Sequence, residues 1–385
     1  MRVLFLTHSY PRFVGDAAGS FLLHLAAALV DEGVDVRVVA PAAPGYPAHE
    51  RLTGITVDRF RYAPQAWETL AYTGEMAQEV RRSLTGKIAL GGFMAGGVTT
   101  AAKVARAFAP DLVHAHWWFP AGVIALSTPS LRRLPLVTTM HGTDVRLARA
   151  SSLARPVLRQ VLQRSRAVTT VSSWLAAEVT AMAPDISPLI APMPVSTELF
   201  APGGQRAADR LLFVGRLNEQ KGIARLLDAL AAMRSRMSLD VVGDGPDSEM
   251  LRDRAESLGI SARITWHGSR PQHELAPFYR SATALVVPSI GEGLGLVTVE
   301  AQLTETPVVA FASGGIVDTI SNGVSGLLVP PGDVAALAQA CDRLHENPGL
   351  RESLGRGGRA AALARFAPAA AARTYAAIYR DARVA

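Results

Sequence analysis

Residues 284–301 read Ala-Leu-Val-Val-Pro-Ser-Ile-Gly-Glu-Gly-Leu-Gly-Leu-Val-Thr-Val-Glu-Ala. The apolar, β-branched start predicts a buried strand over 284–287, and the glycines after it predict a loop that enters a helix over about 296–303. A glycine-rich loop at a helix start lets backbone N–H groups approach an anion, which the helix dipole also attracts. The stretch therefore predicts an anion site at the carboxyl end of a buried strand.

Two carboxylates accompany this loop. Glu292 projects from it, and Glu300 lies one turn inside the following helix. Carboxylates repel a bare phosphate, but they accept hydrogen bonds from vicinal hydroxyls of a sugar or a ribose. The combination favours a sugar nucleotide over free phosphate, the alternative being a plain glycine turn before a capped helix.

A second strand, loop and helix follow the same plan at residues 213–222, which read Phe-Val-Gly-Arg-Leu-Asn-Glu-Gln-Lys-Gly. Arg216 and Lys221 would form a diphosphate clamp, because a guanidinium and an ammonium both make charge-assisted hydrogen bonds to phosphate. A surface pair beside a helix start is the alternative. The chain lacks the G-x-x-x-x-G-K-[ST] pattern of a P-loop, and it lacks G-x-G-x-x-G after its first strand, which argues against a dinucleotide cofactor.

The same alternation of short strands and helices runs through the whole chain and predicts α/β architecture with parallel sheets. Two series of strands are expected, at residues 2–7, 35–40, 111–114, 136–140 and 167–171, and then at 210–214, 239–242, 264–267, 284–287 and 308–311. Residues 191–204 are rich in Pro and Gly and predict the connection between two domains.

We therefore expect two doubly wound, Rossmann-like domains, with the carboxyl ends of both sheets around one central cleft where ligands bind. The expected division is residues 1–195, 196–366 and a helical segment 367–385 with a break near Pro368. The length of 385 residues supports two domains, because single cores rarely grow beyond 250–300 residues.

The composition predicts a globular protein in a reducing compartment. Hydrophobic residues make up 49% of the chain, and the single cysteine, Cys341, allows no intrachain disulfide. Residues 88–102 are the longest fully uncharged candidate for a membrane span but number only 15. We expect a cytoplasmic protein without a transmembrane helix.

Basic charge is concentrated in the first half, where residues 1–195 carry a net charge of +6. Six arginines lie between residues 146 and 166 with no acidic residue among them. A solvated helix face is one interpretation, and a patch for anionic lipid or an acidic acceptor is the other. No nucleic-acid partner is expected, because no aromatic residues alternate with these arginines and no known nucleic-acid motif occurs.

In the first half, the loop of residues 10–20 and three histidines, His114, His116 and His141, follow predicted strands. Strand ends of a parallel sheet share one edge, so these residues should face the cleft. His141 is expected in the active site, and His116 is either there or buried. An H-x-H pair without nearby carboxylates is a weak zinc signal, and we expect no metal.

Taken together, Gly291–Ala301, Val214-Gly-Arg216 to Lys221-Gly, His141-Gly-Thr-Asp144 and Gly314-Gly-Ile-Val-Asp318 resemble the motifs of the group 1 retaining glycosyltransferases of GT-B architecture. The resemblance spans nearly the whole chain. It implies a metal-independent hexosyltransferase that moves a sugar from a nucleoside-diphosphate donor to a hydroxyl acceptor, with no cofactor. The acceptor could be a glycolipid, a polysaccharide or a small molecule, and the basic first domain suggests peripheral contact with the inner face of an anionic membrane.

By this resemblance, Arg216 and Lys221 would hold the donor diphosphate, and Glu292 would contact hydroxyls of the transferred sugar. Glu300 would bind the ribose, and amides of Gly295, Leu296 and Val297 would meet the phosphates. His141 would lie near the reacting sugar, and the loop that begins at Gly15 would approach the donor phosphate and the acceptor.

The resemblance also implies the mechanism: the acceptor attacks the face that the leaving group departs from, and the leaving phosphate takes the acceptor proton. Two alternatives stay open from the residues. One is a nucleotide-sugar 2-epimerase or sugar-phosphate synthase on the same fold. The other is a non-catalytic sugar-nucleotide sensor, which would use Arg216, Lys221 and Glu300 but give His141 and Glu292 no task.

Overall fold

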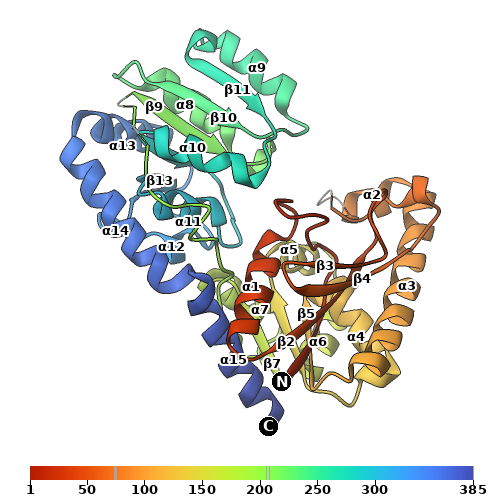
Figure 1. The fold of residues 1–385 in the computed structure, drawn as a ribbon. Helices are drawn as coiled ribbons and strands as arrows, with labels where there is room; N and C mark the ends of the chain where they lie inside the picture. Colours follow the sequence, from red (N-terminus) through yellow and green to blue (C-terminus); the bar gives the residue numbers. More distant parts are fainter. Residues whose placement is uncertain (73–75, 205, 208, 385) are drawn as a thin grey trace. The chain divides into compact units, whose positions relative to one another are not determined.

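A computed structural model describes residues 1–72, 76–204, 206, 207 and 209–384 of the chain (Figure 1). The chain divides into two compact units, which are described separately. Unit 1 comprises Met1–Pro194 with Pro368–Ala385, and unit 2 comprises Val195–Ala367. Both divisions lie within one or two residues of the expected domain boundaries.

Unit 1 is built on an eight-stranded sheet in the order β3-β4-β2-β1-β5-β6-β7-β8, in which only the β3–β4 pair is antiparallel. Because β1 pairs with both β2 and β5, the strand order reverses at β1, which is where ligands of such sheets bind. The strands are β1 (Arg2–Leu6), β2 (Asp35–Pro41), β3 (His49–Leu52), β4 (Ile55–Phe60), β5 (Leu112–His116), β6 (Leu136–Met140), β7 (Ala167–Thr170) and β8 (Leu189–Ile190).

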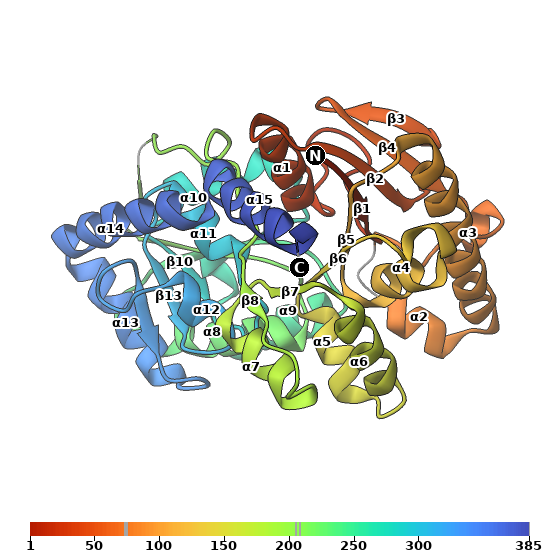
Figure 2. The same ribbon diagram turned by 90° about the horizontal axis from the view of Figure 1, so that it is seen from below.

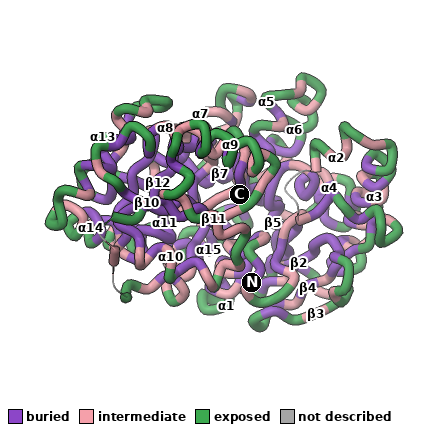
Figure 3. The backbone as a smooth tube through the Cα atoms, turned by 90° about the horizontal axis from the view of Figure 1, so that it is seen from above, coloured by how far each residue is buried: buried purple, intermediate pink, exposed green. Residues whose placement is uncertain are grey.

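Helices pack on this sheet, and its central strands are buried (Figure 3). The helices of unit 1 are α1 (Ser20–Asp31), α2 (Met76–Arg82), α3 (Leu84–Phe108), α4 (Val123–Ser127), α5 (Thr143–Ala150), α6 (Ala154–Arg164), α7 (Ser173–Met182) and α15 (Pro368–Val384). The last helix lies beside α1 (Figure 2), so the end of the chain completes the unit that its beginning starts.

Helix α3 is long and apolar enough to span a bilayer when only length and composition are considered, which the 15-residue uncharged run did not suggest. Its Phe93, Ala101 and Val104 lie in the core of unit 1. Only 33% of the apolar window of α3 is buried, so packing on the sheet covers one face of the helix.

Unit 2 is a six-stranded parallel sheet in the order β11-β10-β9-β12-β13-β14, which is the 3-2-1-4-5-6 order of the dinucleotide-binding fold. The strands are β9 (Arg210–Val214), β10 (Ser238–Val242), β11 (Ile264–Gly268), β12 (Ala284–Val287), β13 (Val308–Phe311) and β14 (Leu327–Val329). The helices are α8 (Ile223–Ala232), α9 (Ser248–Ser257), α10 (Leu275–Ser281), α11 (Leu296–Leu303), α12 (Ile316–Thr319), α13 (Val334–Glu346) and α14 (Pro348–Phe366). The strand order again reverses at the first strand, β9, which pairs with β10 and β12.

Candidate functional site

The loops that follow β9 and β12 meet at the carboxyl edge of the unit 2 sheet. The Ile290 amide donates to the carbonyl of Gln220 over 3.2 Å, and the Gln220 side chain donates to the Gly291 carbonyl over 3.3 Å. Gly222 makes the approach possible: its φ is 69°, and a Cβ there would lie 2.1 Å from the Pro288 carbonyl oxygen. No side chain fits at this position, so the sequence Lys-Gly sets the distance between the two loops.

Lys221 and Glu292 form an ion pair across this junction. The Lys221 Nζ lies 2.9 Å from both carboxylate oxygens of Glu292, and the two side chains are 23% and 14% exposed. The Asn218 side chain accepts the Lys221 amide and so fixes the turn that carries the lysine. The sequence predicted both residues in the site, whereas the direct contact between them was not expected.

Arg216 lies in the same loop, between β9 and Lys221, and is half-buried. Its carbonyl accepts the Asn218 amide over 3.1 Å, so the backbone turns back toward Lys221 directly after it. The structure therefore brings Arg216, Lys221 and Glu292 to one edge of one sheet.

Helix α11 begins at this edge, directly after the glycine loop. Gly295 precedes it with φ 84°, in the left-handed region that glycine adopts without strain. The first amides of a helix have no acceptor within it, and here they belong to the half-buried Leu296 and Val297. The Gly315 amide donates to the Glu292 carbonyl over 2.7 Å and holds the loop from the β13 side. The predicted phosphate-binding amides are thus on a fixed loop beside the Lys221–Glu292 pair.

Glu300 is buried one turn inside α11, with 6% of its surface exposed. Tyr279 donates its hydroxyl to one carboxylate oxygen over 2.6 Å, and Gln272 donates to the other over 3.2 Å. Burial raises the pKa of Glu300 to about 7, although both hydrogen bonds act in the opposite direction. The carboxylate is therefore oriented before any ligand arrives. Tyr279 and Gln272 were not predicted, because they precede Glu300 by 21 and 28 residues.

This burial predicts a pH dependence of stability. Because the pKa of Glu300 is higher in the folded chain than its ordinary 4.5, folding takes up a proton between pH 4.5 and 7, and stability falls as the pH rises through that window. Glu300→Gln removes this loss, so we expect the variant to be more stable than the wild type at pH 8 by roughly 3 kcal/mol. Chemical unfolding at pH 5 and pH 8 measures it. Glu274→Gln, at a carboxylate that is 44% exposed, is the control and should change neither value. A wild type and Gln variant of equal stability at pH 8 would contradict the prediction.

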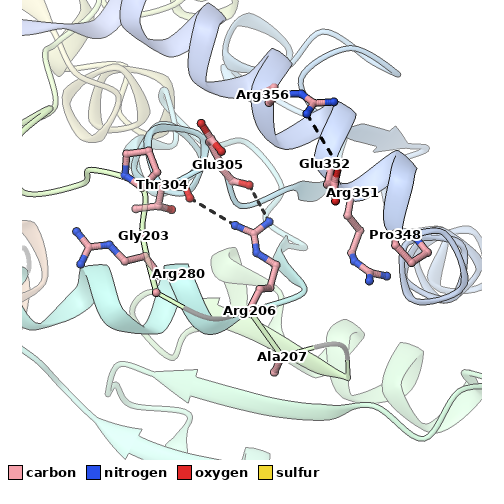
Figure 4. A pocket seen from close by; sticks show the side chains of 12 residues that line it. Gly203, Arg206, Ala207, Arg280, Thr304, Glu305, Pro348, Arg351, Glu352 and Arg356 are labelled. Carbon is pink, nitrogen blue, oxygen red and sulfur yellow. Dashed lines mark hydrogen bonds and ion pairs between the residues drawn. The ribbon is translucent and has the colours of Figure 1, made fainter.

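The other end of α11 lacks the glycine that commonly ends such a helix, and Glu305 takes the left-handed conformation there with φ 59°. Figure 4 shows how the exposed carbonyls are capped: Arg206 donates to the carbonyl of Glu305 over 2.8 Å and to that of Thr304 over 3.4 Å. A cavity of about 440 Å³ lies beside this cap, next to Arg280 and Arg351, which also donate to carbonyls. Arg206 and Arg351 thus cap the carboxyl ends of α11 and α13, and Arg280 holds the carbonyl of Ala201. The cavity lies away from the glycine loop, at the opposite end of α11.

In unit 1, His114 is a structural residue. It is fully buried, and its two ring nitrogens lie 2.7 Å from the hydroxyls of Tyr379 on α15 and Thr139 on β6. Burial lowers the pKa of His114 to about 3, so the ring is neutral at physiological pH. This histidine attaches the last helix to the sheet.

His116 and His141 form a second, uncharged pair. The His116 Nδ1 lies 3.2 Å from the His141 Nε2, and the ring centroid of Trp117 lies 4.2 Å from that of His141. Burial lowers the pKa of both histidines well below 6.5, and neighbouring histidines lower it further. His141 is thus available as a neutral hydrogen-bonding group at the carboxyl edge of the unit 1 sheet, and it cannot supply a positive charge there at neutral pH.

Asp144 holds the loop that carries His141. Its buried carboxylate accepts the amides of His141, Gly142 and Val145 over 2.9–3.1 Å, and that of Trp118 over 3.4 Å. Burial raises the pKa of Asp144 to about 6, against the lowering effect of these four hydrogen bonds. The sequence motif His-Gly-Thr-Asp therefore combines the predicted site residue His141 with the carboxylate that positions its loop.

The loop that contains Gly15 is held by Asp16. The Asp16 carboxylate accepts Arg12 Nε over 2.6 Å and Nη2 over 3.0 Å, and it also accepts the amides of Arg12 and Ala18. Burial alone would raise the pKa of Asp16, but these bonds bring it below the usual value. Gly15 itself has φ 96° and is half-buried. The Arg12–Asp16 ion pair thus orders the loop that contains Gly15.

Two further observations concern metal-binding side chains and basic charge. Among the described residues, no group of three or more His, Cys, Asp or Glu side chains could hold a metal ion. Two of the six arginines in 146–166 pair with acids outside that stretch, Arg149 with Glu178 and Arg159 with Asp185. The basic patch is therefore smaller than the sequence suggested.

Two family models and several curated relatives match the chain. Residues 18–190 match the model of glycosyltransferase family 4, and residues 199–361 match that of the group 1 glycosyl transferases. A D-inositol 3-phosphate glycosyltransferase of Frankia alni is 37% identical over 65% of this chain and 70% of its own length. The protein of the same name from Kribbella flavida is 30% identical over 89% of this chain and 86% of its own.

The fold is shared with solved structures. A sucrose-phosphate synthase of Thermosynechococcus elongatus superimposes with a TM-score of 0.81 at 24% identity, over 99% of this chain and 98% of that one. This likeness confirms the predicted pair of doubly wound domains of GT-B architecture.

Proposed function

The chain belongs to the group 1 glycosyltransferases of family 4, retaining hexosyltransferases that use nucleotide sugars, and from this premise we propose that it transfers a hexose from a nucleoside-diphosphate donor to an acceptor hydroxyl. The observation that supports the proposal best is the junction in unit 2, where the Lys221–Glu292 pair lies beside the first amides of α11. A cation and helix amides suit a diphosphate, and a carboxylate suits sugar hydroxyls.

In the proposed reaction, the bond between the anomeric carbon and the diphosphate oxygen breaks while the acceptor oxygen bonds to the same face of that carbon. The acceptor proton passes to the departing phosphate oxygen. Lys221, Arg216 and the amides of Leu296 and Val297 stabilise the negative charge that grows on this phosphate, which is where fixed donors lower a barrier most. Glu292 orients the sugar hydroxyls, and Glu300 binds the ribose.

Unit 1 contributes the acceptor side of the proposal. His141 is proposed to act near the reacting sugar as a neutral hydrogen-bonding group, in keeping with its lowered pKa. The loop at Gly15, ordered by the Arg12–Asp16 pair, is proposed to approach donor phosphate and acceptor. We further propose that the protein acts without a metal, in the cytoplasm and at the inner face of the membrane.

The donor is testable by ligand-dependent stabilisation. UDP, GDP, ADP and TDP, and then their hexose derivatives, should be compared in thermal unfolding, because a ligand of the folded state raises the unfolding temperature by mass action. One base should give a clear increase, and its sugar nucleotide should then be consumed with retention at the anomeric carbon. Release of an epimerised sugar without acceptor would support the epimerase instead, and no stabilisation by any nucleotide would contradict the proposal.

Glu292→Ala tests the carboxylate. We expect kcat to fall about 100-fold, because the sugar hydroxyls lose a charged acceptor and Lys221 loses its partner, which together are worth about 3 kcal/mol. Steady-state kinetics with saturating donor measures it, and Glu249→Ala, at an exposed position of α9, serves as the matched control. A folded Glu292→Ala variant with normal kcat would show that Glu292 has no role in transfer, as expected of a sensor.

A further inference from the structure

Unit 1 contains a cavity of about 700 Å³ at the carboxyl edge of its sheet. Residues of α2 and α3 line one part of it, residues of α5 and α6 line another, and the segment after β5 lines a third. The volume is within the range of pockets that enclose small molecules. The mechanism proposed above makes no use of most of this space.

The wall is mostly apolar. Its side chains include Leu70, Val80, Leu90, Phe119, Val123 and Val157. Among the described lining residues, the acidic and basic side chains are limited to Asp144 and Arg81, apart from His8. The Asp144 carboxylate already accepts four backbone amides. A phosphorylated polyol, such as the acceptor named for the inositol phosphate relatives, would find few partners along this wall.

One end of the cavity is polar. His8, Ser9 and Thr143 lie there, and Trp117 donates its indole N–H to the Thr143 hydroxyl over 3.1 Å. The Nδ1 of His8 is buried without a hydrogen-bond partner in the described part of the chain. Burial lowers the pKa of His8 to about 4, so the ring is neutral and can accept a hydrogen bond from a hydroxyl group. The cavity thus has an apolar body and one end that suits an alcohol.

The rim of the cavity is apolar and exposed. Leu153 lines the cavity and is 85% exposed, and Val157, one helical turn further on, is 38% exposed. The same segment carries basic charge. The Arg155 guanidinium donates to the carbonyls of Ala148 and Arg149, and because these acceptors are neutral, they do not balance its positive charge. Exposed leucine beside uncompensated arginine is the surface chemistry that suits an anionic lipid layer.

We propose that this cavity binds the hydrocarbon chain of a lipid acceptor, with the lipid's hydroxyl at the His8 end. The proposal rests on the proposed function, because it names the acceptor class of that reaction. It sets this chain apart from relatives named for a water-soluble inositol phosphate acceptor.

Binding of 1-hexanol, 1-octanol and 1-decanol tests the cavity directly, with intrinsic tryptophan fluorescence as the readout, because Trp117 and Trp118 line the wall. We expect saturable binding that strengthens about fourfold with each added methylene group. Val157→Glu places a charge in the wall and should weaken decanol binding at least tenfold. Val30→Glu, at a 49% exposed position of α1 outside the cavity, is the matched control and should bind decanol as the wild type does. Leu153→Glu, at the most exposed lining position, is a second variant that folding should tolerate.

Vesicle experiments test whether the bound hydrocarbon chain belongs to a membrane lipid. The protein should sediment with phosphatidylglycerol vesicles that contain diacylglycerol and transfer sugar to that lipid, and Leu153→Glu should reduce both. Failure of the alcohols to bind wild-type protein, or equal binding by Val157→Glu, would overturn the proposal. Alcohol binding without any association with vesicles would contradict the proposal that the hydrocarbon belongs to a lipid acceptor. Nucleotide binding, measured separately, decides the proposed function: if it is intact while the alcohols fail, only the acceptor class is wrong.

Discussion

Lys221→Met is expected to lower kcat about 1,000-fold, the upper range for loss of one group that stabilises developing charge. The Lys221 Nζ lies 2.9 Å from both oxygens of Glu292, so its removal has two effects. The departing diphosphate loses a cation, and Glu292 becomes an unpaired anion beside it. Steady-state and single-turnover rates of donor consumption measure the loss.

The second effect can be separated from the first. Lys221→Met combined with Glu292→Gln removes the repulsion and should bind the nucleoside diphosphate more tightly than Lys221→Met alone, since residues in contact are not additive. Lys103→Met, at an exposed lysine of α3, is the control and should keep normal kcat. A Lys221→Met rate within threefold of wild type would show that the lysine serves only the loop junction.

Unit 1 is expected to unfold in mild acid. His8, His114, His116 and His141 all have a pKa well below 6.5 in the folded chain because they are buried. Unfolding lets them take up protons, so their contribution to stability is complete above pH 6.5 and is lost as the pH falls toward 4. The pKa of Asp144 is raised to about 6, so its effect on stability is opposite to that of the histidines. It offsets the contribution of one of the four histidines. The net effect of these groups is a loss of stability of unit 1 as the pH falls below 6.5.

Native domains are stable by only about 5–15 kcal/mol, so a loss shared by several buried histidines is expected to lower the unfolding midpoint measurably. The stability of unit 2 should instead rise as the pH falls from 7 to 4.5, because Glu300 becomes protonated in the folded state over this range. Denaturant titrations from pH 7.5 to 4.5, followed by tryptophan fluorescence, can report this. Four of the five tryptophans, at positions 67, 117, 118 and 174, belong to unit 1. His114→Gln should reduce the slope by about 1.4 kcal/mol per pH unit. An unfolding midpoint that stays constant down to pH 5 would contradict the argument.

The buried parallel strands were predictable because each is a short, nearly continuous apolar run. Arg210–Val214, Ala284–Val287 and Val308–Phe311 occur where the sequence placed them. The hairpin of β3 and β4 was missed, since His49–Leu52 begins with three consecutive polar residues, His-Glu-Arg, which are also typical of a loop. Helix α3 was not recognised because five of its residues, at 86, 91, 92, 96 and 97, are glycines, which disfavour a helix unless packing requires it.

Candidate site residues could be proposed from the sequence where they lie in a local motif, whereas the residues that contact them could not. Glu292 and Glu300 belong to the glycine loop and its helix, whereas Lys221 is 71 positions from Glu292 and Tyr279 is 21 from Glu300. Periodicity and spacing report only on neighbours along the chain. The neutral state of His141 also depends on burial by residues from several elements, which no local pattern contains.

The attachment of α15 has a consequence for synthesis. Because Pro368–Ala385 completes unit 1, unit 2 is topologically an insertion within unit 1, and the polypeptide passes between the units twice. Unit 2 can therefore assemble on the ribosome while unit 1 still lacks the Tyr379 hydroxyl that His114 requires. The amino-terminal half, although made first, becomes complete last, which reverses the usual vectorial order of domain folding.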